Sequence, residues 1–357
     1  MRVDQLVPAF HRGDAIGDEA WELRSFFRAE GFQSDIYCLG RDRGLEGESK
    51  LFEEFPAPAA SDVTMLHFAL PSPLSGALAA LPSKKAIIYH NITPAGFFED
   101  INPEFARIAR IGREELAGLA SATDLSLADS EYNRLELEAL GFRNTHVFPL
   151  FVDFAKYAAP ENALLREVYR DDRTNILFVG RIAPNKKIEN LIKTVFYYKK
   201  YISPLVRLIV VGKTKTFPSY FAAVSRMADE FYLKPGEVRF VGHVPDEEMF
   251  ALYRASDVFL SLSEHEGFCL PLVESMIFDL PIVALGAAAV PYTLGEAGLL
   301  LGEFRPARTA EAVHLAAHDP ALRSALVESG RRELGRLKSF PREAFLRDRL
   351  AELRRRK

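Results

Sequence analysis

Short apolar segments alternate with longer helical patterns along almost the whole chain, and this alternation limits the fold more than any other feature. Runs such as 175–179, 206–211 and 258–262 are apolar at nearly every position, which is typical of strands buried on both faces. Strands of this kind that alternate with helices form βαβ units and parallel sheets. The sequence therefore predicts an α/β fold built from doubly wound, Rossmann-like domains.

The predicted elements fall into two series, separated by a polar stretch at 153–172. The first series has strands at 6–8, 35–38, 63–67, 86–90, 125–128 and 146–148, with helices at 18–30 and 133–140. The second has strands at 175–179, 206–211, 238–241, 258–262, 281–285 and 299–301, with helices at 187–200, 219–233, 246–255, 271–279 and 309–317. A length of 357 residues suits two cores. We predict domains at 1–165 and 166–340, followed by a helix at 341–357.

Composition excludes several classes of protein. Hydrophobic residues make up 48% of the chain and charged residues 26%, as in an ordinary globular protein. No apolar run approaches the roughly 20 residues of a membrane-spanning helix, and residues 1–4 lack the pattern of a secretory signal. The sequence thus predicts residence in the cytoplasm.

The net charge and the two cysteines limit which partners, disulfides and metal sites we expect. A net charge of −4 gives no support to nucleic-acid binding, although the basic end at 353–357 is compatible with peripheral contact with the inner face of the cell membrane. The bland alternative is a solvated helix end with cations near its negative dipole. Cys38 and Cys269 lie far apart, without histidine or cysteine at metal-ligand spacing, so we expect neither a disulfide nor a zinc site.

The strongest chemical signal is a pair of glutamates eight residues apart, Glu266 and Glu274, around a predicted helix start. Gly267 allows close approach of a ligand to the backbone, and Pro271 suits the first helical turn. Free N–H groups at such a turn bind phosphate, and a carboxylate one turn further on can accept hydrogen bonds from ribose hydroxyls. Taken alone, the pair is equally consistent with a solvated glutamate and a helix-capping one.

A second cluster, Arg181 and Lys186, follows the predicted strand 175–179. Ligands bind at this end of the strands in open α/β sheets. A guanidinium and an ammonium there suit a diphosphate, whose negative charge grows as it leaves. In isolation, such a pair is more often part of a surface salt bridge.

Together, and in this order, these segments resemble the C-terminal domain of the family 4 glycosyltransferases. The resemblance rests on Gly180-Arg181-Ile182 with Lys186, Phe240 to Pro245, Glu264 to Glu274, Ala287 to Pro291 and Gly295 to Gly298. It implies the GT-B fold, in which two Rossmann-like domains face a central cleft, the first binding the acceptor and the second the nucleotide sugar. It also implies that the last helix packs back on the first domain.

The resemblance assigns roles to individual residues. It implies that Arg181 and Lys186 bind the diphosphate, that Glu274 binds the ribose, and that Val244 borders the nucleobase. Glu266 and the backbone of Gly267, Phe268, Cys269 and Leu270 would hold the donor sugar and its phosphate. One departure is Lys187, because the family commonly has glycine after its conserved lysine.

The first half resembles the family more loosely. Gly17 follows the first strand and would let a helix N-terminus approach the donor phosphates, although a plain strand-to-helix turn accounts for it equally well. His90, at a strand end, matches the family's active-site histidine near the reacting sugar. His67 also ends a strand, but we expect a structural role for it.

The resemblance implies a retaining hexosyltransferase, with a UDP- or GDP-linked donor and an acceptor that is a carbohydrate, a lipid-linked glycan or a small molecule, as in polysaccharide biosynthesis. No Asp-x-Asp occurs in the chain, so we expect no metal and no cofactor other than the nucleotide sugar itself. Other readings are a catalytically silent nucleotide-sugar-binding subunit, a GT-B epimerase or phosphorylase, and a nicotinamide-dependent oxidoreductase. The last lacks the full glycine fingerprint.

Overall fold

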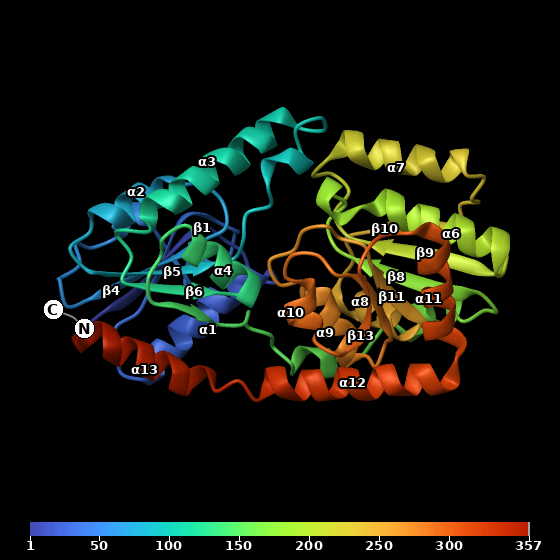
Figure 1. The fold of residues 1–357 in the computed structure, drawn as a ribbon. Helices are drawn as coiled ribbons and strands as arrows, with labels where there is room; N and C mark the ends of the chain where they lie inside the picture. The colour runs from blue at the N-terminus through green and yellow to red at the C-terminus, as the bar shows by residue number, and fades with distance from the viewer. Residues whose placement is uncertain (356–357) are drawn as a thin grey trace. The chain divides into compact units, whose positions relative to one another are not determined.

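The computed structural model describes residues 1–355, which form two compact units (Figure 1). Unit 1 consists of Met1–Gly96, Glu104–Val152 and the C-terminal segment from Phe340, and unit 2 of Phe97–Pro103 and Asp153–Ser339. The main division thus lies at 152/153, whereas the sequence suggested 165/166. Aromatic packing explains this position, because Tyr157 lies against Phe250 and Phe278 of unit 2.

Unit 1 contains a seven-stranded parallel sheet in the order β3-β2-β1-β4-β5-β6-β7. Its strands are β1 (Val3–Phe10), β2 (Ile36–Arg41), β3 (Lys50–Leu51), β4 (Val63–Phe68), β5 (Lys84–Tyr89), β6 (Leu125–Ala128) and β7 (Thr145–Val147). Its helices are α1 (Ala15–Ala29), η1 (Phe52–Glu54), α2 (Pro73–Ala80), η2 (Ala95–Phe97, whose last residue belongs to unit 2), α3 (Pro103–Leu119), α4 (Glu131–Ala139) and α13 (Arg342–Arg355). The strand order reverses between β1 and β4, which is where ligands bind in such sheets.

The C-terminal helix α13 is part of the core of unit 1. Its buried Leu346, Leu350 and Leu353 pack with Phe27 of α1 and with residues of the central strands. In Figure 1, α13 runs beside α1, and Arg347 pairs with Glu30 at the end of that helix. Chain segments more than 300 residues apart in sequence therefore share one core.

Unit 2 contains a six-stranded parallel sheet in the order β10-β9-β8-β11-β12-β13. Its strands are β8 (Thr174–Val179), β9 (Val206–Val211), β10 (Val238–Gly242), β11 (Val258–Ser261), β12 (Ile282–Leu285) and β13 (Gly298–Leu301). Its helices are η3 (Lys156–Ala158), α5 (Ala163–Val168), η4 (Pro184–Lys186), α6 (Ile188–Tyr201), α7 (Pro218–Glu230), α8 (Asp246–Arg254), α9 (Leu270–Ile277), α10 (Val290–Leu294), α11 (Pro306–His318) and α12 (Pro320–Lys338). The order reverses between β8 and β11.

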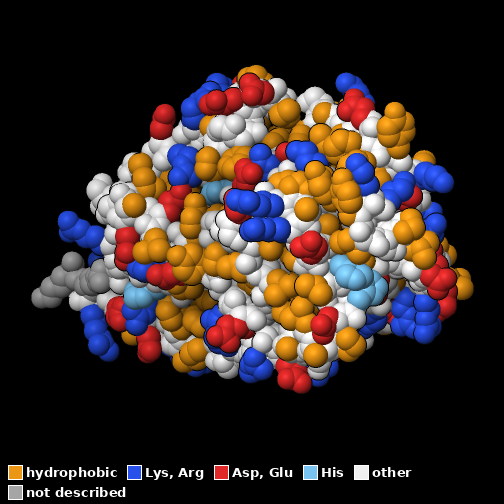
Figure 2. All heavy atoms as spheres, turned by 45° about the vertical axis from the view of Figure 1, so that its right-hand side comes forward, with side chains coloured by type: hydrophobic (Ala, Val, Ile, Leu, Met, Phe, Trp, Pro, Cys, Tyr) orange, Lys and Arg blue, Asp and Glu red, His pale blue; other side chains and the backbone are white. Residues whose placement is uncertain are grey.

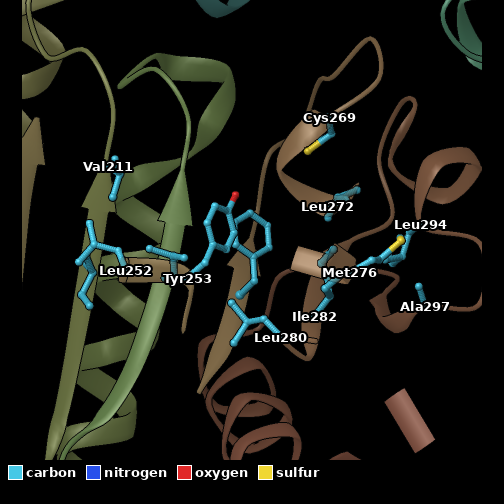
Figure 3. Packing of buried hydrophobic residues seen from close by; sticks show 14 of the residues in the cluster. Val211, Leu252, Tyr253, Cys269, Leu272, Met276, Leu280, Ile282, Leu294 and Ala297 are labelled. Atoms are coloured by element: carbon cyan, nitrogen blue, oxygen red, sulfur yellow. The ribbon is translucent and has the colours of Figure 1, made fainter. Parts of the chain in front are cut away.

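The core of unit 2 fixes α8 and α9, the helices before and after β11. Leu252 and Tyr253 of α8, and Leu272 and Met276 of α9, pack with strand residues such as Ile282 (Figure 3). Because interiors are packed as densely as organic crystals, these contacts hold the start of α9 in a defined position. That start carries the predicted phosphate site.

No helix within residues 1–355 is long and apolar enough to cross a bilayer. On the face seen in Figure 2, lysine and arginine side chains are interspersed with acidic and hydrophobic ones. This mixture is ordinary for a globular protein surface.

Candidate functional site

The first predicted cluster lies directly after β8, at the reversal point of the unit 2 sheet. Gly180 has φ 155°, and a Cβ added at neighbouring Gly212 would lie 1.9 Å from the Gly180 carbonyl oxygen, so glycine is required at 212. Arg181 follows with an exposed side chain that makes no hydrogen bond or ion pair within the described residues. A guanidinium is therefore available at the edge where ligands bind.

Lys187 shows why its departure from the family pattern matters. It is the N-cap of α6 and adopts the left-handed conformation, with φ 52° and ψ 49°. Glycine reaches this region without steric cost, whereas a side chain there is strained. The Lys187 ammonium lies 3.2 Å from the Glu264 carboxylate and 5.8 Å from the centre of the Phe97 ring.

The structure brings Lys186 and Glu266 together. Nζ of Lys186 donates to both carboxylate oxygens of Glu266, at 2.5 and 2.6 Å. The two side chains are only 16% and 9% exposed, so their attraction is weakly screened. The pair joins the loop after β8 to the loop after β11, the two strands that meet at the reversal point.

Asn185 fastens these two loops to each other, and sequence reasoning did not single it out. Its side-chain amide donates to the carbonyl of His265 at 2.9 Å, and its own carbonyl accepts from the backbone N–H of Glu264 at 2.9 Å. Asn185 is 95% buried. The signal available in the sequence was its place in the loop beside Lys186, which says nothing about a partner 80 positions away.

The start of α9 matches the predicted anion site in its local geometry. Its N-cap, Cys269, has φ 69° and supplies no side-chain cap, and Pro271 occupies the first turn. Uncapped N-termini leave backbone N–H groups for a ligand. Burial raises the pKa of the Cys269 thiol well above its ordinary value, with Glu266 adding to the effect, so the thiol stays neutral and is not a nucleophile.

Glu274 lies one turn into α9, as predicted, but its carboxylate is already bonded. Tyr157 donates to Oε1 at 3.0 Å and Tyr253 donates to Oε2 at 2.7 Å. The residue is 4% exposed. Neither tyrosine was predicted, because nothing in the spacing links position 157 to position 274.

Further predicted donor residues also belong to unit 2. Gly267 and Leu270 are half-buried, whereas Phe268 and Cys269 are buried. The carbonyl of Phe268 accepts from the hydroxyl of Thr293 at 2.5 Å. Val244 lies between β10 and α8 and packs against the hydrophobic core.

In unit 1, Gly17 forms the tight junction between β1 and α1. A Cβ at this position would lie 1.6 Å from the carbonyl oxygen of His11, so only glycine fits. The N–H of Gly17 donates to the Asp14 carboxylate at 2.7 Å and caps the helix. The strand-to-helix turn, one of the two roles weighed from the sequence, accounts for these contacts.

His90 is the end of a hydrogen-bonded chain whose protons can be assigned. The Gln5 amide nitrogen donates to Ala20, which leaves its oxygen to accept from Nε2 of His67 at 2.9 Å. Nδ1 of His67 must then accept from Nε2 of His90 at 3.0 Å, while Nδ1 of His90 donates to Asp129 at 3.0 Å. His90 therefore carries both protons and is an imidazolium.

The pKa shifts agree with this assignment. Burial lowers the pKa of His67 well below its ordinary value, and the charge on His90 lowers it further. Burial alone would lower the pKa of His90 too, but the carboxylate of Asp129 and the hydrogen bond to it raise it. The His90 side chain is 3% exposed and both its nitrogens are bonded, so its charge rather than a free nitrogen is what it offers.

Glu19 and Arg342 complete this cluster, and the sequence indicated neither. Glu19 is fully buried; its Oε2 lies 4.0 Å from Nδ1 of His90, and its Oε1 accepts from Arg342 at 3.2 Å and from the N–H of Phe151 at 3.1 Å. Arg342 begins α13 and covers the Phe148 ring at 4.2 Å. Two cations and two carboxylates thus balance inside unit 1.

Glu19, His67 and His90 also form a group whose ligand atoms lie within 4.8 Å of one another. A hydrogen bond already joins the two rings, with Nδ1 of His67 3.0 Å from Nε2 of His90, so we assign the group to hydrogen bonding rather than to a metal. A separate hollow of about 630 Å³ lies between α2 and α3, lined by residues such as Ser75, Gly76, Glu115 and Gly118. It contains none of the predicted site residues.

Known proteins resemble this chain in sequence. Residues 165–333 match the family described as glycosyl transferases group 1, a range that includes every predicted site residue of unit 2. The chain is 31% identical to a GDP-mannose-dependent alpha-mannosyltransferase of Mycobacterium tuberculosis over 267 residues, which are 71% of this chain and 65% of that protein. It is 30% identical to O-antigen chain mannosyltransferase B of Escherichia coli over 124 residues, or 35% and 32% of the two chains. The matched parts thus span less than two thirds of these relatives.

Solved structures extend the likeness to the fold of the whole chain. A sucrose-phosphate synthase from Thermosynechococcus elongatus has a TM-score of 0.73 at 17% identity, covering 99% of this chain and 98% of that one. HepE of Anabaena, solved with UDP-glucose, has a TM-score of 0.71 at 17% identity with the same coverage. These neighbours have the GT-B fold, so the predicted fold class is confirmed. Residues 165–333 thus match the glycosyl transferases group 1 family, and the chain as a whole has the GT-B fold.

Proposed function

We propose that the protein is a retaining hexosyltransferase that moves a hexose from a nucleoside diphosphate sugar to a hydroxyl group of an acceptor. One observation carries the proposal: Arg181, Lys186, Glu266 and the uncapped start of α9 converge at the reversal point of the unit 2 sheet. Unpaired positive charge beside free backbone N–H groups suits a diphosphate. In this proposal Glu274 binds the ribose and Val244 borders the base.

In the proposed reaction the acceptor oxygen bonds to the anomeric carbon as the bond from that carbon to the diphosphate breaks. Arg181, Lys186 and the α9 dipole stabilise the negative charge that develops on the leaving diphosphate. The acceptor's proton passes to a diphosphate oxygen on the same face, which retains the anomeric configuration without a carboxylate base. Glu266 holds Lys186 and the donor sugar, and the imidazolium of His90 adds positive charge in unit 1.

The relatives suggest which donor to try first. Two of them are named mannosyltransferases, and one of these is named as dependent on GDP-mannose. We therefore propose GDP-mannose as the first donor and UDP-glucose as the second. The acceptor would be a glycan, a lipid-linked glycan or a small molecule, and no metal would be needed. Work in the cytoplasm and contact of the basic C-terminal end with a membrane remain predictions from the sequence.

The test is a panel of nucleoside diphosphate sugars, incubated with the full chain with and without added Mg²⁺. Release of nucleoside diphosphate and thermal stabilisation by the donor are both measured, because a ligand that binds the folded state raises the melting temperature. We expect one donor to respond in both assays, with or without the metal. A donor that stabilises without turnover in the presence of candidate acceptors would indicate a silent binding subunit instead.

Three variants test the site assignment. Lys186→Ala and Glu274→Ala should each lower kcat/KM by about 100-fold, the loss expected when one charged contact to the substrate is removed. Glu53→Ala, an exposed change in η1 of unit 1, is the control and should leave it unchanged. Equal activity in all three proteins would refute the assignment.

A further inference from the structure

The carboxylate of Glu274 is buried, and hydrogen bonds hold both of its oxygens. Each of its oxygens accepts one phenolic hydroxyl, from Tyr157 at 3.0 Å and from Tyr253 at 2.7 Å. The residue is 4% exposed, although most glutamates lie at the surface. Such a buried acid calls for an explanation.

The two phenols come from separate parts of unit 2. Tyr253 belongs to α8, whereas Tyr157 lies on the short helix η3, four residues after unit 2 begins at Asp153. Both rings pack against Phe278, with centroids 6.0 and 5.0 Å away, and Tyr157 also packs against Phe250 at 5.4 Å. This packing fixes the hydroxyls and therefore the plane of the carboxylate.

The remaining hydrogen-bonding capacity of Glu274 matches a ribose. A carboxylate has about four acceptor positions on its two oxygens. One position on each oxygen is taken by a phenol, so one on each oxygen stays open. Two neighbouring hydroxyl groups, as in the 2′,3′-diol of a ribose, would donate to this pair.

We propose that Tyr157 is a positioning residue for the donor: its hydroxyl, with that of Tyr253, holds the ionised Glu274 carboxylate in the orientation that accepts the ribose hydroxyls of a nucleoside diphosphate. The proposal rests on the proposed function, because it takes Glu274 as the ribose contact. It adds a residue that lies outside the sequence segments resembling the family.

The surroundings of Glu274 explain why the phenols are needed. Burial raises the pKa of Glu274, and nearby Asp246 raises it further. The hydrogen bonds from Tyr253 and Tyr157, and the charge on Lys156, lower it. Without a phenol, the balance shifts toward the neutral acid, which accepts hydrogen bonds from ribose less well.

The experiment measures binding of UDP and GDP to the full-length wild type and to Tyr157→Phe, by calorimetry between pH 5 and pH 8. The 2′-deoxy forms of both nucleotides are titrated as well, because they lack one of the two hydroxyls. Tyr253→Phe is a second variant of the same carboxylate. Tyr198→Phe is the matched control: its hydroxyl is buried in unit 2 and bonded to Thr174 and His314, away from every proposed donor residue.

We expect Tyr157→Phe to weaken binding of the nucleotide about three- to tenfold at pH 7, as when a charge-assisted hydrogen bond is loosened. Affinity should be present above the pKa of Glu274 and lost as the pH falls through it, so the loss in the variant should begin at a higher pH. The penalty for 2′-deoxy nucleotides should be smaller in the variant than in the wild type. Tyr198→Phe should bind like the wild type.

Other outcomes are separable. If Tyr157→Phe binds as tightly as the wild type, or more tightly, at every pH, the hydroxyl either only packs or competes with the ribose, and the proposal is overturned. If the wild type binds nucleotide but does not distinguish the 2′-deoxy form, the ribose role of Glu274 fails while the transferase function stands. If the wild type binds neither UDP nor GDP, the proposed function itself fails.

Discussion

Each unit carries a charged cluster beside the point where its strand order reverses, but the two clusters are built in opposite ways. In unit 1, Glu19, Asp129, His90 and Arg342 neutralise one another inside the core. In unit 2, Lys186 has the single partner Glu266, and the exposed Arg181 has none within residues 1–355. We call the unit 1 group of Glu19, Asp129, His90 and Arg342 the closed cluster, because its charges pair with one another. We call Arg181, Lys186 and Glu266 of unit 2 the open cluster, because the charge of Arg181 remains available to a ligand.

This difference separates charges that stabilise the fold from charges that are available to bind a ligand. A buried charge must be paired, because desolvation is costly, and once paired it has little left to offer. An exposed charge without a partner adds little to stability, yet it can bind an anion. Stability measurements should therefore respond to unit 1, and ligand-binding measurements to unit 2.

The largest effect is expected from Arg342→Ala. The change removes the only cation that is hydrogen-bonded to the fully buried Glu19 carboxylate within the described residues, which should lower the free energy of unfolding of unit 1 by about 3–4 kcal/mol. Trp21, the single tryptophan, lies on α1 and reports unfolding of unit 1 in a urea titration followed by fluorescence. Arg347→Ala on the same helix removes exposed pairs with Glu30 and Glu343 and should cost far less. Equal losses would mean that the buried cluster does not stabilise unit 1.

A pH series sharpens the same comparison. Burial and the neighbouring Asp129 raise the pKa of Glu19 from 4.5 to about 7. The folded state then binds a proton that the unfolded state has lost, so the contribution of Glu19 to the stability of unit 1 should fall as the pH rises from about 4.5 through about 7. The raised pKa of His90 acts in the same direction. The lowered pKa of His67 acts in the opposite direction below pH 6.5. Glu19→Gln should reduce the change in the free energy of unfolding across this pH range by an amount on the order of 2 kcal/mol.

The control for the pH series is Glu30→Gln, at the exposed end of α1. The hydrogen bond from Arg347 lowers the pKa of Glu30. Any change in stability caused by the titration of Glu30 therefore occurs below pH 4.5, outside the range of this series. Trp21 fluorescence in urea titrations between pH 5 and pH 8 measures all three proteins. Equal pH dependence in the wild type and in Glu19→Gln would show that folded Glu19 binds no proton in this range.

Arg181→Ala tests the open cluster of unit 2, as Arg342→Ala tests the closed cluster of unit 1. We expect at least tenfold weaker binding of the nucleoside diphosphate, or about 1.4 kcal/mol, because an unpaired guanidinium is lost from the diphosphate site. The melting temperature followed by circular dichroism should stay within about 1 °C of the wild type, since an exposed side chain without a partner is removed. A variant that melts much earlier but binds normally would move Arg181 from the site to the fold.

The sequence predicted the open cluster far better than the closed one, and chain distance explains why. Arg181 and Lys186 lie in one loop, Glu266 and Glu274 around one helix start, and both follow strands recognised from their apolar runs. Local spacing was enough to place them at a sheet edge.

The closed cluster of unit 1, like the hydroxyl groups that hold Glu274 in unit 2, depends on contacts that no local pattern records. Arg342 bonds to Glu19 across 323 positions, and Tyr157 bonds to Glu274 across 117. His67, expected to be structural, fixes the protonation of His90. Helix α3 was not predicted either. Packing of the whole chain decides such features, so a single sequence cannot reveal them.

Lys187→Gly is expected to have the smallest effect and to mark the border between the two kinds of cluster. Glycine removes the strain of a side chain at φ 52°, about 1 kcal/mol, but it loosens the unfolded chain and loses the half-exposed pair with Glu264. The net gain in stability should be at most about 0.5 kcal/mol, whereas Lys187→Ala, which keeps the strain, should be destabilised, as thermal denaturation of both variants can check. Full activity of the glycine variant would assign the lysine to loop packing against Glu264, whereas weaker nucleotide binding in an equally stable protein would make Lys187 a third cation of the open cluster.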